Sequence, residues 1–266
     1  MKAKYSKTIT CILFAGIVSS CSLILEDRTA CPCWLEVTFR DPDQVRQSAD
    51  VSGWRGTALF AERIGKEEAG RTWLKDVSKG PLVFSACEGM ERCRLEDHYL
   101  TIPLGYQCDS VYAYREQVDA TGDRVPVNVA LHKQFATVFL DIHKEREEMR
   151  RYSFQVSGNS CGFDLLDFQP VPGSFRFRAK PENDDGQVSF RIPRQLDDGL
   201  RIDLERDSEL CCRLPIGQYI RKTGYDWSSE DLEDIYLSVD LVEGRVQIGV
   251  AGWEQGEDFS IRIIRY

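Results

Sequence analysis

The sequence predicts an all-β protein that folds as two antiparallel β-sandwich domains behind an export signal. Apolar and polar residues alternate with a period of two over many short segments, which is typical of half-buried antiparallel strands. Turn residues such as Asp185-Gly186 and Asp198-Gly199 separate these segments at a spacing of roughly ten residues, as in β-sandwiches. Hydrophobic residues make up 42% of the chain, which is enough for buried cores.

The N-terminus has the layout of a secretory signal. A segment with three lysines precedes the apolar segment Ile9–Val18. The next residues, Ser19-Ser20-Cys21, complete a motif that resembles the bacterial lipobox, in which a peptidase cuts before the cysteine and lipid is attached to its thiol. We therefore predict residues 1–20 as a signal peptide and Cys21 as the lipidation site. The alternative is an uncleaved membrane anchor, but about ten apolar residues are too few to span a bilayer of roughly 30 Å.

The charge balance argues against one class of partner. The chain carries 34 basic and 43 acidic residues, and the lysines of the signal are lost on cleavage, so the mature protein is more acidic than the whole chain. A nucleic-acid backbone is bound by excess positive charge. We therefore expect no nucleic-acid partner.

The first half of the mature chain predicts mostly strands. Alternating or apolar segments occur at five places, namely Leu35–Phe39, Thr57–Ala61, Leu82–Cys87, Tyr99–Pro103 and Ser110–Tyr114. Between the second and third of these, Glu67–Val77 is predicted as a short helix. A polar, turn-rich segment, Asp119–Pro126, then indicates a domain boundary. The predicted domains span residues 21–126 and 127–266.

The second half shows the clearest alternation. The segment Phe135–Ile142 has few polar residues on either face and is predicted as a central strand. Further strands are predicted at Val188–Ile192, Leu200–Glu205, Ile235–Leu241, Val246–Val250 and Phe259–Ile264. Glu243-Gly244 indicates a hairpin turn between two of them. Ser228, followed by Asp231, predicts one helical turn over Glu230–Asp234, and the charged segment Lys144–Arg151 predicts a solvated loop or short helix.

The cysteines favour thiols or disulfides over a metal site. Eight of the ten would remain as thiols after removal of the signal and lipidation of Cys21. Disulfides can form in an exported chain, and eight cysteines allow 105 different pairings. Cys87 and Cys93 enclose a short loop and are the best local pair. No two cysteine pairs have the spacing of a zinc site. We therefore predict no metal and no cofactor, and leave disulfides and free buried thiols open.

One motif has the pattern of a catalytic serine. Gly158-Asn159-Ser160-Cys161-Gly162 matches the G-x-S-x-G nucleophile elbow, which needs a following helix and a later histidine. The segment Phe163–Pro172 contains two prolines, and every histidine (His98, His132, His143) precedes Ser160. We therefore interpret the motif as a glycine-rich turn. The chain offers many carboxylate pairs for glycoside hydrolysis, but nothing distinguishes one, so we predict no catalytic residue and no enzyme.

Several segments share their order and spacing with a known family. They are Leu25–Pro32, Tyr99–Tyr106, Val111–Tyr114, Leu214–Ile220, Gly224–Trp227, Asp231–Ile235 and Gly252–Glu254. Together they span the mature chain and resemble the FimB-like fimbrial anchor and minor-subunit lipoproteins of Bacteroidetes, which belong to type V pili. This chain departs from the family in its many cysteines, including Cys211-Cys212.

The resemblance implies two transthyretin-like domains, an outer-membrane lipid anchor exposed at the cell surface, and no enzyme activity. It also implies a role in attaching or terminating a fimbria, and so in cell adhesion, with pilin subunits as partners. The final strand is a candidate subunit contact, because Phe259, Ile261 and Ile263 form one apolar face at the chain end. The alternative is that this face is buried in the protein's own sandwich.

A second interpretation is a surface lipoprotein that binds glycans. Such a protein would present exposed aromatic platforms, for which Trp54, Trp73, Trp227 and Trp253 are available. Their scatter along the chain does not indicate one platform. A secreted hydrolase has no group of residues in its favour.

Overall fold

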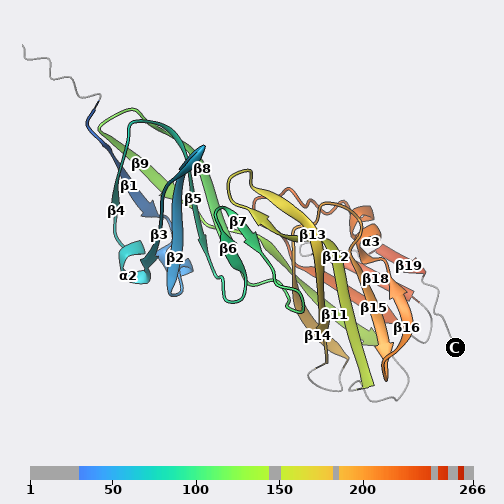
Figure 1. Cartoon of the computed structure of the whole chain (residues 1–266). Helices are drawn as coiled ribbons and strands as arrows, with labels where there is room; N and C mark the ends of the chain where they lie inside the picture. Colours follow the sequence, from blue (N-terminus) through green and yellow to red (C-terminus); the bar gives the residue numbers. More distant parts are fainter. Residues whose placement is uncertain (1–29, 144–150, 182–185, 241–244, 251–256, 261–266) are drawn as a thin grey trace, which may run out of the picture.

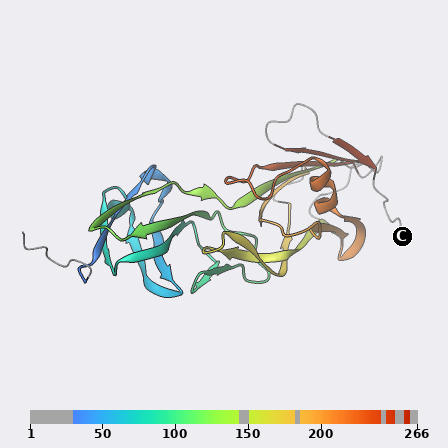
Figure 2. The ribbon, with the colours of Figure 1, turned by 90° about the horizontal axis from the view of Figure 1, so that it is seen from above.

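The computed structural model describes residues 30–143, 151–181, 186–240, 245–250 and 257–260 (Figure 1). The molecule is elongated, with two β-sandwiches placed end to end (Figures 1 and 2). The predicted all-β class is therefore confirmed. Cys21 and most of the segment Lys144–Arg151 lie outside the described residues, as do Ile261 and Ile263.

The first sandwich packs a sheet of three strands on a sheet of five. The smaller has the order β4 (Trp73–Val77), β1 (Cys33–Phe39), β9 (Arg124–Val129). The larger has the order β10 (His132–Lys133), β8 (Tyr112–Ala120), β5 (Gly80–Glu88), β2 (Ser48–Arg55), β3 (Thr57–Gly65). Alternation explains the packing: in β1 the side chains of Leu35 and Val37 are fully buried, whereas that of Trp34 faces outward. Two short elements complete this half, η1 (Pro42–Gln44) and α2 (Lys66–Ala69).

The second sandwich packs a sheet of five strands on a sheet of six. The first has the order β14 (Gln187–Pro193), β11 (Phe135–His143), β17 (Ile235–Asp240), β18 (Arg245–Val250), β19 (Glu257–Ser260). The second has the order β16 (Glu209–Leu214), β15 (Arg201–Arg206), β12 (Tyr152–Asp164), β7 (Tyr99–Thr101), β6 (Arg94–Glu96). β13 (Gln169–Ala179) also pairs with β12, and α3 (Ile216–Lys222) follows β16. Residues from both sheets share one core, in which Phe154 and Phe175 are almost completely buried.

In the part of the chain that the structure describes, each sandwich contains one parallel strand pair that the sequence did not predict. β1 pairs with β9, and β11 pairs with β17, in parallel. In both cases the strand that opens the sandwich pairs with a strand much later in the chain. Alternation shows which face of a strand is buried but not the partner or its direction, so these pairs could not be derived from the pattern.

The strand pairing places the crossing between sandwiches later than the predicted boundary at residue 126. That position lies inside β9, which continues to Val129 along β1. The chain passes to the second sandwich between β10 and β11, at Gln134. In addition, the hairpin β6–β7 precedes this crossing but pairs with β12, with Leu100 opposite Phe163. The second sandwich therefore takes two strands from the first half of the sequence.

Several local predictions were wrong. The helix predicted over Glu67–Val77 is only α2, and β4 follows it, because Gly70 caps α2 and the next segment alternates toward a buried Val77. No helical turn forms over Glu230–Asp234, since Asp226 accepts the Ser228 N–H instead. Among the described residues, no helix is long and apolar enough to cross a membrane.

Candidate functional site at the junction of the two sandwiches

A small apolar cluster joins the two sandwiches. Cys87 and Ala113 of the first sandwich pack against Phe163 and Leu165 of the second. The backbone N–H of Leu165 donates to the carbonyl oxygen of His98 at 2.9 Å. The buried contact and the β6–β7 pairing together fix the end of β12 against the first sandwich.

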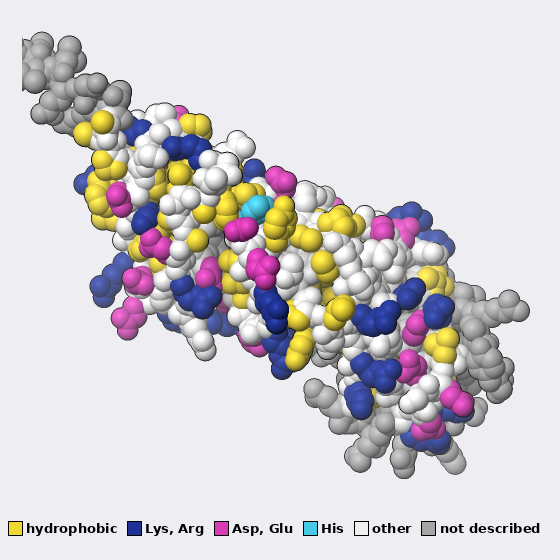
Figure 3. Space-filling view, viewed as in Figure 1, with side chains coloured by type: hydrophobic (Ala, Val, Ile, Leu, Met, Phe, Trp, Pro, Cys, Tyr) yellow, Lys and Arg dark blue, Asp and Glu magenta, His cyan; other side chains and the backbone are white. Residues whose placement is uncertain are grey.

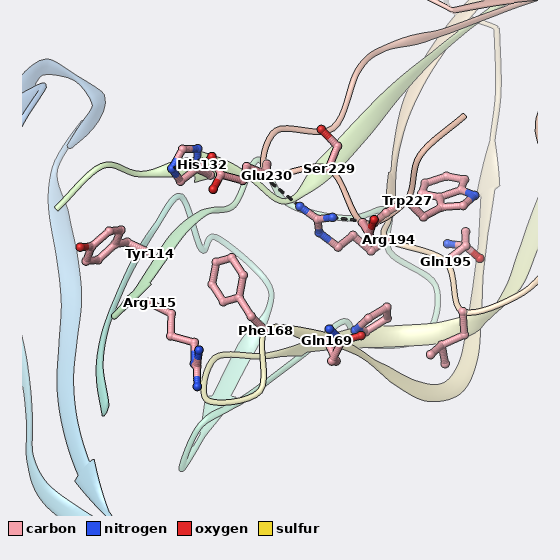
Figure 4. A pocket seen from close by; sticks show the side chains of 13 residues that line it. Tyr114, Arg115, His132, Phe168, Gln169, Arg194, Gln195, Trp227, Ser229 and Glu230 are labelled. Carbon is pink, nitrogen blue, oxygen red and sulfur yellow. Dashed lines mark hydrogen bonds and ion pairs between the residues drawn. The ribbon is translucent and has the colours of Figure 1, made fainter. Parts of the chain in front are cut away.

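A cavity of about 380 Å³ lies beside this junction, between segments far apart in the sequence (Figure 4). Its walls come from β8, β10, the turn between β12 and β13, the segment after β14 and the loop after α3. Figure 4 shows Phe168 in the middle of the view, between Tyr114 and Arg194. The volume is within the usual range of ligand pockets, which is about 300–1,000 Å³.

The turn that carries Phe168 is built by a side chain of β12. The Asp164 carboxylate accepts the backbone N–H of Leu166 at 2.8 Å and that of Asp167 at 3.2 Å. The chain then turns with Phe168 in the left-handed region, at a φ of 59°. A bulky residue rarely adopts this conformation, and such strain persists where surrounding contacts hold it. Here one contact is the ring of Phe163, packed edge to face with centroids 4.8 Å apart.

Arg194 organises the opposite wall. Its side chain is only 4% exposed. The guanidinium donates to Gln134 Oε1 at 2.7 Å, to the carbonyl oxygen of Trp227 at 2.6 Å and to that of Glu230 at 2.9 Å. These acceptors are neutral, so the buried positive charge is hydrogen-bonded but not neutralised by direct contact with them. Burial lowers the pKa of Arg194, while nearby Tyr225, Asp226 and Asp231 act in the opposite direction.

Two polar atoms at the cavity are buried without a hydrogen-bond partner among the described residues. They are Arg115 Nε and Gln195 Oε1. Gln195 is 4% exposed, and its Nε2 donates to the carbonyl oxygen of Pro193 at 2.7 Å, which fixes the orientation of the amide. Buried polar groups are normally paired, so an unpaired one calls for an explanation.

The rim of the cavity ties β10 to the loop after α3. His132 Nδ1 lies 2.9 Å from an Asp231 carboxylate oxygen, and the Lys133 backbone N–H donates to the other at 2.6 Å. Lys133 Nζ also lies 2.6 Å from Asp234. Asp231, predicted as the acidic residue in the first turn of a helix, thus links the two sandwiches instead. His132 lies on the edge strand β10.

The cysteine residues that the sequence singled out do not form the expected bridge. Cys87 and Cys93 are not joined by a disulfide. Cys87 is buried in the junction cluster, whereas Cys93 packs beside the second core, where its N–H donates to the Asp109 carboxylate at 2.7 Å. Burial raises the pKa of Cys93 to about 12 and that of Cys212 to about 11. Protonated thiols are poor nucleophiles at neutral pH.

The G-x-S-x-G segment is not a turn but part of the bulged strand β12. Its register with β13 shifts between Gly158 and Ser160 and again between Ser160 and Gly162. The Ser160 hydroxyl is completely buried and has no partner in the described residues. An inaccessible hydroxyl with no base beside it cannot act as a nucleophile.

Of the four tryptophans proposed as glycan platforms, the three that the structure describes are not exposed platforms. Trp54 is buried, and Trp73 and Trp227 pack partly against the two cores. Trp253 lies outside the described residues. One exposed aromatic pair in the described residues is Phe139 and Tyr236, stacked on neighbouring strands with centroids 5.1 Å apart. The sequence analysis missed this pair, although both rings occupy polar-face positions of alternating strands, which is a detectable signal.

The candidate subunit contact lies at the edge of a sheet. The described part of the last strand, β19, pairs with β18, with Phe259 opposite Val246. Within the described residues, β19 is the outer strand of its sheet.

On the face that Figure 3 shows, basic and acidic side chains are interspersed, so this face has no single-sign field that would attract a nucleic acid.

Known structures share this arrangement of two sandwiches. A candidate polysaccharide-binding protein of Bacteroides thetaiotaomicron matches with a TM-score of 0.61 at 13% identity, over 86% of this chain and 98% of that one. A candidate adhesin from Bacteroides ovatus matches with a TM-score of 0.58 at 12% identity, over 85% and 95%. No protein-family model matches the sequence, and no curated protein sequence does.

The fold therefore places the chain in one structural class with these Bacteroides proteins. Within this class, the fimbrial anchor protein Mfa2 from Porphyromonas gingivalis matches with a TM-score of 0.57 at 12% identity, over 84% of this chain and 98% of that one. The resemblance to FimB-like fimbrial proteins is thus supported by the fold of the described chain as well as by sequence motifs.

Proposed function

We propose that the protein is an outer-membrane lipoprotein that anchors or terminates a fimbria and thereby serves cell adhesion, without enzyme activity. The observation that carries the proposal is the likeness of the whole fold to the fimbrial anchor Mfa2, over nearly all of that chain. The lipobox-like segment at Cys21 supports a lipid anchor, because an anchor must be fixed to the cell. Pilin subunits are the proposed partners.

The lipid anchor is tested at Cys21. We expect Cys21→Ala to abolish incorporation of labelled fatty acid and to move the protein from the membrane fraction to the soluble fraction, since no thiol remains to be acylated. The measurement is metabolic labelling followed by fractionation, with Cys31→Ala as the matched control, because that exposed cysteine lies just beyond the predicted site. Labelling of the Cys21→Ala protein at the wild-type level would exclude this residue as the attachment site.

The fimbrial role is tested at the last strand. We propose that Phe259, Ile261 and Ile263 contact a pilin subunit, because an edge strand can supply ladder hydrogen bonds to a neighbour. Deletion of residues 259–266 is then expected to abolish co-purification with pilin while the melting temperature stays within a few degrees. A truncated protein that unfolds would show that this face belongs to its own sandwich, where three large apolar residues stabilise by about 1.5–3 kcal/mol each.

A further inference from the structure

From the junction cavity we infer a function that goes beyond the fimbrial role and does not depend on it: the cavity binds a carboxylate-bearing sugar, such as a hexuronate unit. Nothing in the fimbrial role explains why polar atoms are buried without partners between the two sandwiches. The chemistry of the walls specifies the ligand in three ways, which are its charge, its hydrogen-bonding groups and its shape.

The charge of the walls favours an anion. Two guanidinium groups, of Arg115 and Arg194, belong to the cavity wall. Arg194 is buried and hydrogen-bonded to neutral oxygens. The carboxylates of Glu230 and Asp231 are 84% and 60% exposed, so water screens their charges far more than that of a buried group. A buried positive charge favours a negative partner in a medium of low dielectric constant.

A ligand that both donates and accepts would pair both of the unpaired atoms. Arg115 Nε–H is a donor and needs an oxygen acceptor, whereas Gln195 Oε1 is an acceptor and needs a hydroxyl or N–H donor. Gln195 cannot satisfy itself by exchanging its amide atoms, because its Nε2 is held by the Pro193 carbonyl oxygen. The same oxygen lies 2.8 Å from where a Cβ at Gly158 of β12 would stand, so it is packed closely against this strand. A carboxylate supplies the acceptor and a ring hydroxyl supplies the donor.

The remaining wall is apolar and aromatic. Phe168 and Trp227 line the cavity together with Pro170. Sugar rings have one face of C–H groups beside their hydroxyls, and such a face packs on an aromatic ring. A volume of about 380 Å³ holds one or two sugar rings. A simple anion would leave Gln195 Oε1 without a donor and these rings without contact.

The test uses the exported protein, purified in detergent, with glucuronate, glucose and acetate as probes in saturation-transfer NMR. We expect glucuronate to bind at least tenfold more tightly than either glucose or acetate, because glucose lacks the carboxylate and acetate lacks the ring. Arg115→Met should weaken glucuronate binding about tenfold or more, which corresponds to the loss of one charge-assisted hydrogen bond. Arg71→Met, which removes an exposed arginine in the loop after α2, is the matched control and should bind as the wild type does.

A second variant keeps the inference testable if Arg115→Met fails to fold. Phe168→Gly removes the central ring, while glycine adopts the φ of 59° at this turn without strain. We expect it to fold and to lose glucuronate binding. The inference is overturned if glucuronate does not bind at about 10 mM, if acetate competes as well as glucuronate does, or if folded Phe168→Gly protein binds as the wild type does.

Discussion

Replacing Gly162 by alanine is expected to lower the free energy of unfolding by about 3 kcal/mol or more. A Cβ at this position would overlap the backbone carbonyl oxygen of Leu100 in β7. Backbone cannot move aside as a flexible side chain can, so the hairpin β6–β7 must separate from β12. This hairpin is the part of the first half of the chain that extends the second sandwich.

The matched control lies two residues away in the same motif. Ser160→Ala removes a buried hydroxyl that has no partner among the described residues. Deleting an unsatisfied buried polar group is neutral or slightly stabilising, so we expect a change within about 1 kcal/mol. Urea denaturation of both variants and the wild type measures the difference in the free energy of unfolding. The comparison holds where this free energy falls with urea concentration at the same slope in all three proteins. Equal stability of Gly162→Ala and the wild type would mean that β7 does not lie so close to β12.

Replacing Arg194 by methionine is expected to destabilise the protein by about 3–5 kcal/mol, because three buried acceptors lose their donor. Methionine replaces the aliphatic stem of arginine but has no donors, so Gln134 Oε1 and the carbonyl oxygens of Trp227 and Glu230 lose the hydrogen bonds of the guanidinium. Each buried acceptor left unpaired costs about 1–3 kcal/mol. The loop Trp227–Glu230 should also become more accessible to hydrogen exchange, because Arg194 holds it to β11 and β14.

An exposed arginine provides the comparison. Arg213 forms a two-pronged ion pair with Asp203, at 2.7 and 3.0 Å, but its side chain is 54% exposed. Water and salt screen such a pair, so Arg213→Met should cost less than about 1 kcal/mol. Thermal and urea denaturation of the two variants separates the roles. A similar loss of stability in both variants would show that the buried hydrogen bonds of Arg194 stabilise the protein no more than an exposed ion pair does.

The sequence by itself determined the fold class and the position of many strands. Side chains alternate between the two faces of a strand, so a strand that buries one face has apolar residues at every second position of its sequence. This is why β1, β5, β11, β14, β15 and β17 were predicted close to their observed bounds. The prediction failed where the period is weak: β2 carries small residues such as Ala49 and Gly53, and β12 contains the glycines that were interpreted as a turn.

Only the tertiary structure decided which strands pair and where the cavity lies. The parallel partner of β1 begins at Arg124, and the hairpin β6–β7 joins a strand that starts at Tyr152. Such long-range pairs depend on the whole fold, because the same alternation is compatible with many partners. Nothing in the sequence distinguishes Arg194 from other charged residues that follow a strand. It becomes a buried charge beside Arg115 and Gln195 only because segments from Tyr114 to Glu230 converge at one junction.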